Sequence, residues 1–130
     1  MINDQDDSPE SLDFDTFEDC RDPKKIAAIR DLNDRFRATL TGGRVLMTSG
    51  VAALEAETTA RVLTAVRTFT AFTRGNDPWG EHDFGAVEVD GERIFFKIDC
   101  MDLACEMASE DASDPAKTMR VMTIMLASEY

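Results

Sequence analysis

The stretch AVEVDGERIFFKIDC, residues 86–100, decides the fold. Its centre, Asp90-Gly91, lies between two runs in which apolar and polar residues alternate. Asp-Gly favours a two-residue β-hairpin turn, because both central residues of a type I′ turn need positive φ. A turn of that length also sets the register. The expected pairs are Val89 with Glu92, Glu88 with Arg93, Val87 with Ile94, and Gly85 with Phe96.

Alternation along this hairpin predicts one buried face and one solvent face. The predicted core face carries Val87 together with the alternate residues Ile94, Phe96, Ile98 and Cys100. The opposite face carries Glu88, Arg93, Lys97 and Asp99. This arrangement is typical of an antiparallel sheet that has helices on one side only.

Before the hairpin, the sequence predicts two amphipathic helices. Asp22-Pro23 opens the first, since Asp caps free backbone N–H groups and Pro suits the first helical position. Gly42-Gly43 ends it. Its apolar stripe is Ile26, Ile29, Leu32, Phe36 and Leu40, and Arg30, Asp34 and Arg37 fall away from that stripe. The second helix is predicted over Glu55–Arg74, with Phe69 and Phe72 on its core face.

Shorter segments complete the predicted order of elements. Arg44–Thr48 is expected to be a buried strand, followed by a turn at Ser49-Gly50. Asp102–Asp114 reads as an acidic loop, and Ala116–Glu129 as a C-terminal helix opened by Asp114-Pro115. A buried strand is the alternative there, because both odd- and even-numbered residues near the end of the chain are apolar. The fold class is α+β, in the order α-β-α-β-β-α, with a small antiparallel sheet packed against helices.

Length and composition indicate one domain in the cytoplasm. A chain of 130 residues is long enough to bury a core. Residues 1–21 carry eight acids and one Arg, so we expect an acidic tail before a domain at 22–130. Leu12, Phe14 and Phe17 offer the alternative of a short docking motif. No membrane span or signal peptide is indicated, and an odd number of cysteines, three, favours reduced thiols.

The net charge of −12 is unevenly distributed. Residues 24–74 hold nine bases and four acids, whereas residues 75–114 hold twelve acids and two bases. Direct nucleic-acid binding is disfavoured by the overall charge, and the basic residues of the first half are spread over two helices. The acidic second half instead suggests a surface for a basic partner.

The loop of residues 76–85 is the best candidate for chemistry. It holds the only His and the only Trp, and Glu81-His82-Asp83 places two carboxylates beside an imidazole that titrates near neutrality. The structural interpretation is favoured over the catalytic one. In the structural interpretation, Asp77 caps backbone amides, Trp79 covers the core and His82 makes one hydrogen bond that holds the loop in place.

Metal and cofactor chemistry finds little support in the motifs. His82, Asp83, Cys100 and Cys105 lack the usual zinc spacing. The carboxylates Asp99, Asp102, Glu110 and Asp111 suit a hard cation, but a solvated acidic loop is the simpler interpretation. No P-loop, dinucleotide fingerprint or nucleophile elbow occurs in the chain. We therefore predict neither a metal nor a cofactor.

Several segments together resemble a known family of small proteins. They are residues 32–37 (LNDRFR), 41–45 (TGGRV), 76–78 (NDP), 80–85 (GEHDFG), 97–99 (KID), 109–111 (SED) and 120–127 (RVMTIMLA). The chain resembles, over Ile26–Tyr130, the bacterial domain-of-unknown-function 3768 family, which is found mostly in alphaproteobacteria. It departs from that family's pattern at Cys100-Met101, where aromatic residues are usual. The resemblance transfers no catalytic role and implies a small bacterial accessory protein rather than a metabolic enzyme.

These observations lead to two hypotheses of function. The first is a small acidic cytoplasmic accessory protein that is not an enzyme. It would bind a protein partner through an acidic hairpin and loop surface formed by Asp99, Asp102, Glu110 and Asp111. The alternative is a small hydrolase or metal-dependent enzyme centred on Glu81, His82 and Asp83.

Overall fold

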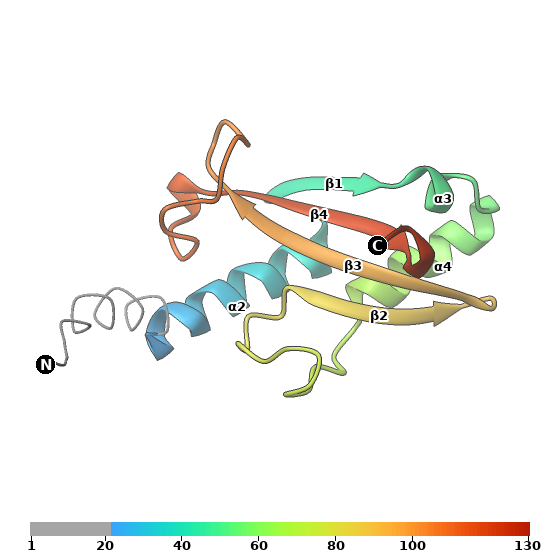
Figure 1. Cartoon of the computed structure of the whole chain (residues 1–130), viewed down its shortest axis with the longest axis horizontal. Coiled ribbons are helices and arrows are strands. Elements are labelled where there is room, and N and C mark those ends of the chain that lie inside the picture. The colour runs from blue at the N-terminus through green and yellow to red at the C-terminus, as the bar shows by residue number, and fades with distance from the viewer. Residues whose placement is uncertain (1–21) are drawn as a thin grey trace, which may run out of the picture.

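A computed structural model describes residues 22–130 and shows one four-stranded sheet with helices beside it (Figure 1). The strand order is β1-β4-β3-β2. Their bounds are β1 Gly43–Met47, β2 Phe84–Val89, β3 Glu92–Met101 and β4 Met119–Leu126. Expectations about residues 1–21, including Leu12, Phe14 and Phe17, lie outside the described residues. The α+β class is confirmed.

The hairpin of β2 and β3 has the register that the turn predicted. Val89 faces Glu92, Val87 faces Ile94 and Gly85 faces Phe96. Asp90 and Gly91 both have positive φ, at 52° and 82°. A short turn with these dihedrals matches the right-handed twist of the two strands it joins.

The last strand corrects the sequence prediction in two ways. Ala116–Glu129 is not a helix, because Asp114-Pro115 opens only the 3-10 turn η1 (Pro115–Lys117) before β4 begins. β4 pairs antiparallel with β3 and parallel with β1, so the sheet is mixed rather than purely antiparallel. β4 lies in the middle of the sheet, with its inner face in the core and Met125 buried on the other face, which accounts for apolar residues at both odd and even positions. Met122 and Ile124 on one face of the strand and Met125 on the other are all buried.

The helices begin about where the sequence placed them and end earlier. α2 spans Pro23–Thr39, with the Asp22 side chain accepting the N–H of Lys24 at 2.9 Å. The C-terminal cap of α2 is Leu40, whose backbone is in the left-handed conformation with φ 59°, so the helix ends before the glycine pair. Within residues 22–130, no helix is long and apolar enough to cross a membrane.

The second predicted helix is shorter than expected. α4 spans Ala56–Arg67, and a short helix, α3 (Ser49–Ala52), stands where a turn was predicted. Phe69 and Phe72 lie beyond the end of α4, yet both pack against the core. Phe69 and Phe72 fit the helical spacing of apolar residues, so the sequence prediction extended the helix through them. They are in an irregular segment, which can bury side chains without being helical.

The core lies between the sheet and the two long helices. Phe36 of α2 and Val62 and Val66 of α4 meet the inner face of the sheet, and all three are 2% exposed or less. The sheet contributes Ile94, Phe96, Ile98, Met122 and Ile124. Each such side chain contributes about 1.5–3 kcal/mol when it is fully buried.

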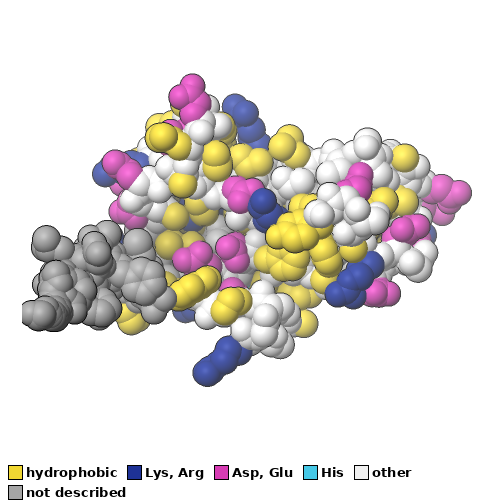
Figure 2. All heavy atoms as spheres, in the orientation of Figure 1, with side chains coloured by type: hydrophobic (Ala, Val, Ile, Leu, Met, Phe, Trp, Pro, Cys, Tyr) yellow, Lys and Arg dark blue, Asp and Glu magenta, His cyan; other side chains and the backbone are white. Residues whose placement is uncertain are grey.

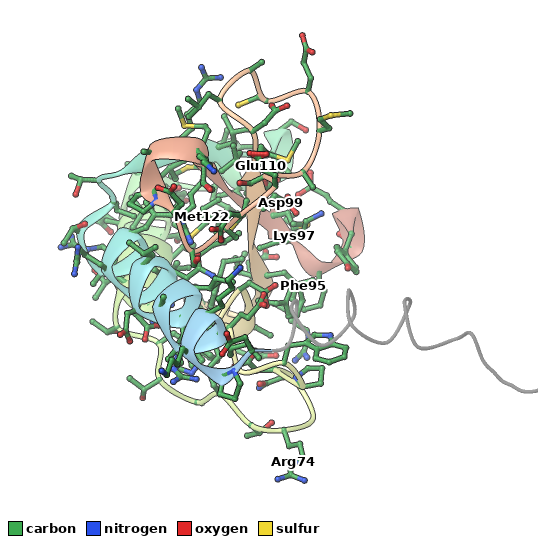
Figure 3. All side chains as sticks on the ribbon, turned by 90° about the vertical axis from the view of Figure 1, so that its left-hand side faces the viewer. Arg74, Phe95, Lys97, Asp99, Glu110 and Met122 are labelled. Carbon is green, nitrogen blue, oxygen red and sulfur yellow. The ribbon has the colours of Figure 1, made fainter. Side chains whose placement is uncertain are left out.

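The opposite side of the sheet, which we call the outer face, carries no long helix in the described part of the chain. By register it holds Arg44, Leu46, Phe84, Ala86, Glu88, Arg93, Phe95, Lys97, Asp99, Met101, Met119, Val121, Thr123 and Met125. Figure 3 shows Phe95, Lys97 and Asp99 on the side of β3 away from α2, whereas Met122 points toward α2. The 3-10 turn η2 (Ala127–Glu129) returns Tyr130 to this face, where its ring lies 5.6 Å from Phe95.

Candidate functional site

Asp77 organises the loop that precedes β2. Its side chain is nearly buried and its carboxylate accepts the backbone N–H groups of Glu81 at 3.1 Å and His82 at 3.2 Å. The backbone of His82 is in the left-handed conformation, with φ 57°, which is uncommon for a residue other than glycine. The two hydrogen bonds hold the backbone in this conformation, so Asp77 caps backbone amides as the structural interpretation predicted. Trp79 is 53% exposed and does not cover the core.

The His82 ring is held on three sides. Its Nδ1 lies 2.8 Å from Asp34 Oδ1 on α2, and its Nε2 lies 3.7 Å from Asp77 Oδ2. The ring stacks on Phe72 with 3.8 Å between centroids and 4° between planes. Only 24% of the side chain is exposed. Through its hydrogen bond to Asp34 and its stacking on Phe72, the imidazole joins α2 to the loop.

A second buried polar group ties α2 to the sheet. Asn33 is fully buried and donates from Nδ2 to the Glu81 carbonyl at 3.0 Å. Its Oδ1 accepts the Nε–H of Arg120 at 2.7 Å, and Arg120 Nη2 donates to the Ala112 carbonyl at 2.7 Å. This chain of hydrogen bonds connects α2, the central loop, β4 and the acidic loop. Removing a member would leave buried polar atoms unpaired.

Arg37, which the helical stripe placed away from the core, is in fact buried at 5% exposure. Its Nη2 donates to the Phe69 carbonyl at 3.2 Å, and its guanidinium lies 5.1 Å from the Phe72 ring centroid. Nη1 lies 3.1 Å from Asp34 Oδ1, an ion pair without hydrogen-bond geometry. The expectation failed because the segment after α4, including Phe69 and Phe72, covers this side of α2.

Glu81 and Asp83 do not combine with His82 into a relay. Among residues 22–130, no hydrogen bond joins either carboxylate to the His82 ring. Burial raises the pKa of the Glu81 carboxyl above its ordinary value, and the neighbouring charges of Asp83 and Asp77 raise it further. Burial likewise raises the pKa of Asp83. The three consecutive residues therefore have separate roles, and the partner of His82 is Asp34.

The four candidate metal ligands of the sequence are not gathered into one site. Cys100 Sγ contacts Asn33 Oδ1 at 3.9 Å, and burial raises the pKa of its thiol. Cys105 instead lines a hollow of about 280 Å³ on the outer face. In the described residues, no three His, Cys, Asp or Glu side chains are placed to hold a metal ion.

The four acids of the predicted binding surface divide into two kinds. Asp102 and Asp111 build the loop, because they accept the backbone N–H groups of Glu106 at 3.0 Å and Ser113 at 3.1 Å. Hydrogen bonds from Ser113 lower the pKa of Asp111. Asp99 and Glu110 are exposed beside lysines, Asp99 at 3.5 Å from Lys97 and Glu110 at 3.6 Å from Lys117.

Sequence reasoning found the central loop but missed its partners. Asn33, Asp34 and Arg37 lie on α2, and Arg120 lies on a segment expected to be helical. One signal was present in the sequence. Asn33 falls between Ile29 and Phe36 at helical spacing, and a polar residue inside an apolar stripe indicates a buried polar contact.

Comparison with known proteins places the chain in a family. No curated protein and no solved structure matches it. A family model described as "Protein of unknown function (DUF3768)" matches residues 47–129, which is more than half of the chain. The match includes the central loop, the hairpin and β4, and it leaves out α2 with Asn33 and Asp34. The chain thus belongs to the DUF3768 family of proteins of unknown function, in agreement with the resemblance in its motifs.

Proposed function

We propose that this protein is a non-enzymatic accessory protein that binds a protein partner through the outer face of its sheet and the adjoining acidic loop, residues 102–114. The observation that carries the proposal is the one-sided packing of the sheet. α2 and α4 cover the inner face, while Leu46 on the outer face is 51% exposed and Tyr130 is 73% exposed. Figure 2 shows hydrophobic side chains gathered on this side, with charged ones around and between them.

Apolar residues continue from the outer face onto the acidic loop. Leu103 and Met107 are 60% and 67% exposed, and Cys105 of the same loop lines the hollow beside Leu46 and Asp99. Contiguous exposed apolar residues with a polar rim are typical of protein–protein interaction sites. The hollow offers such a partner a place for one apolar side chain.

Charge on this surface supports a basic partner. The acidic loop, residues 102–114, holds five acids and no Lys or Arg, whereas the outer face beside it carries Arg44 and Lys97 as well as Asp99. Surface charge of one sign steers association and excludes partners of like charge. Binding should therefore weaken as salt shortens the Debye length from about 10 Å to about 3 Å.

Cytoplasmic location is part of the same proposal. It rests on cysteine use, since Cys100 and Cys105 are both free thiols and reduced thiols suit the cytoplasm.

The enzyme alternative, centred on Glu81, His82 and Asp83, has weaker support. Within residues 22–130, neither Glu81 nor Asp83 forms a hydrogen bond with the His82 ring, whose Nδ1 lies 2.8 Å from Asp34 instead.

The test is affinity capture from a bacterial lysate with matched variants. Leu46→Asp, and separately Asp99→Lys with Glu110→Lys, should abolish capture of the specific partner while the melting temperature stays unchanged. Arg35→Glu, on the exposed side of α2, is the control and should capture normally. Asp102 and Asp111 are left intact, because reversing them would break the loop itself. Capture that survives both outer-face variants but is lost in a folded His82→Ala protein would move the function to the central loop.

A further inference from the structure

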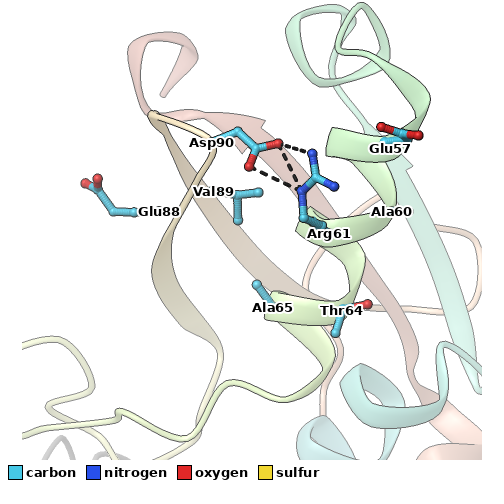
Figure 4. A pocket seen from close by; sticks show the side chains of 8 residues that line it. All are labelled: Glu57, Ala60, Arg61, Thr64, Ala65, Glu88, Val89 and Asp90. Carbon is cyan, nitrogen blue, oxygen red and sulfur yellow. Dashed lines mark hydrogen bonds and ion pairs between the residues drawn. The ribbon is translucent and has the colours of Figure 1, made fainter.

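A second candidate surface lies at the edge of the sheet, where the hairpin meets α4 (Figure 4). A groove of about 760 Å³ runs between the helix and β2. Its lining includes Glu57, Ala60, Arg61, Thr64, Glu88 and Asp90. Binding sites for ligands commonly enclose about 300–1,000 Å³, so the groove has the size of one.

One wall of this groove is an unpaired strand edge. Among residues 22–130, β2 is the last strand of the sheet and pairs only with β3. The Ile98 N–H donates to the Asp83 carbonyl at 2.8 Å. In an antiparallel pair, hydrogen-bonded and non-hydrogen-bonded residues alternate along each strand, so the backbone N–H and C=O groups of Ala86 and Glu88 point away from β3. Within residues 22–130, no other backbone or side-chain group bonds to them. These N–H and C=O groups form a template for one more strand.

The other wall leaves room for that strand. Three of the five α4 residues that line the groove, Ala60, Thr64 and Ala65, have small side chains. A neighbouring strand lies about 4.8 Å away in the hydrogen-bonding direction and turns alternate side chains to each face. An added strand would therefore direct every second side chain toward these small residues and the others toward solvent.

Charge around the groove selects the occupant. Asp90 binds Arg61, with Arg61 Nε at 3.0 Å, and also accepts from Thr58 at 2.8 Å. Glu57 has no ion pair in the described part of the chain. The Glu88 side chain is 68% exposed, pairs with Arg93 at 3.3 Å and points away from α4 (Figure 4). A second copy of this chain carries the same net charge of −12, which opposes self-association. A strand that alternates basic and apolar residues would instead place its basic side chains on the side of Glu88 and its apolar ones over α4.

We propose that the free edge of β2, together with the flank of α4, binds an extended basic segment of a protein partner, which adds to the sheet as a fifth strand. In this mode main-chain hydrogen bonds to Ala86 and Glu88 supply affinity, and the groove selects the alternate side chains. The edge borders the outer face, to which the side chains of Ala86 and Glu88 belong by register. Its test changes neither Leu46 nor the acids Asp99 and Glu110, so each proposal can fail without the other.

The probe is a capped hexapeptide that alternates Lys and Val, equal in length to the six residues of β2. Titration into the 15N-labelled full chain should shift the backbone amide signals of Ala86 and Glu88 and of groove residues on α4. Two control peptides alternate Glu and Val, or carry N-methyl groups on every second Lys-Val amide. Both should bind about tenfold more weakly or worse, because one loses charge complementarity and the other loses backbone donors.

The matched variants are Ala86→Pro and Ala86→Val. Proline removes an N–H that points away from β3 and so spares the ladder, as edge strands allow, whereas valine keeps the N–H. Proline should weaken Lys-Val peptide binding by about tenfold and valine should not. Should the proline variant fail to fold, Glu57→Lys with Glu88→Lys replaces it and should reverse the preference to the Glu-Val peptide.

Three results would overturn the proposal. The first is the absence of shifts at Ala86 and Glu88 with millimolar Lys-Val peptide. The second is equal binding of the N-methylated peptide. The third is a dimer of the unliganded chain, seen by sedimentation, that Ala86→Pro dissociates, because the edge would then belong to a second copy.

Discussion

His82 joins parts of the chain that lie 48 residues apart, through its contact with Asp34. Replacing it with alanine should lower the free energy of unfolding by about 1–3 kcal/mol, because the ring stacking is lost and a buried polar contact is broken. Urea unfolding at pH 7 measures the change. The loss should be smaller in His82→Asn, since Asn tolerates the left-handed backbone better than Ala. Equal stability of His82→Ala and wild type would contradict a structural role.

Asp83 predicts a pH dependence of stability. Burial raises its pKa in the folded state, so the folded protein binds that proton more tightly than the unfolded chain does. The stability that this group contributes is present at low pH and is lost as pH rises through the raised pKa. Asp83→Asn should therefore be more stable than wild type at pH 7, and this advantage should shrink toward pH 4. Urea unfolding at the two pH values tests the sign.

Glu110→Gln is the matched control for the loss of one negative charge. The Glu110 side chain is 74% exposed, so its replacement should change stability little at either pH. An advantage of Asp83→Asn that is the same at pH 7 and pH 4 would show that burial of the charge is not its cause.

Among the elements, the hairpin was predictable because its information is local. Turn chemistry at Asp90-Gly91 fixes both the turn and the register within a few residues. β4 was not predictable in the same way. Asp114-Pro115 is a valid local start signal for a helix, and it does start a 3-10 turn, but burial between β1 and β3 determines the rest of the segment. Tertiary packing overrides local preference there.

The candidate site shows the same limit. The loop, its Asp77 caps and the special position of His82 follow from a short stretch rich in turn-forming residues. Asp34 and Arg120 come from distant elements, and no spacing in a single sequence links them to residue 82. The helical stripe also misplaced Arg37, because Phe69 and Phe72 of the segment after α4 pack over that side of α2.

Gly91→Val tests the turn that orders the hairpin. Gly91 has φ 82°, and a side chain there would meet no atom within 4 Å, so the effect comes from the backbone alone. A β-branched residue at positive φ should cost about 1–3 kcal/mol, which thermal and urea unfolding would show. Gly75→Ala is the control, since Gly75 has no positive φ and its new Cβ would lie 3.7 Å from Thr73. An unchanged melting temperature in Gly91→Val would remove this turn from the account.

On the scale of the molecule, the sheet, both long helices and the core cluster all lie within residues 22–130. Deleting residues 1–21 should therefore leave a cooperative melt with a midpoint close to that of the full chain. Differential scanning calorimetry measures the transition. A broad, non-cooperative melt after the deletion would show that Leu12, Phe14 and Phe17 belong to the core.

The central claim is that the outer face is the surface that meets a protein partner. Site-specific photo-cross-linking in bacterial cells tests it most directly, with a photoreactive residue at Leu46 on the outer face or at Arg35 on the exposed side of α2. The account predicts a discrete adduct with one partner from position 46 and none from position 35. An adduct from position 35 alone, or none from either position while a functional partner is captured, would contradict it.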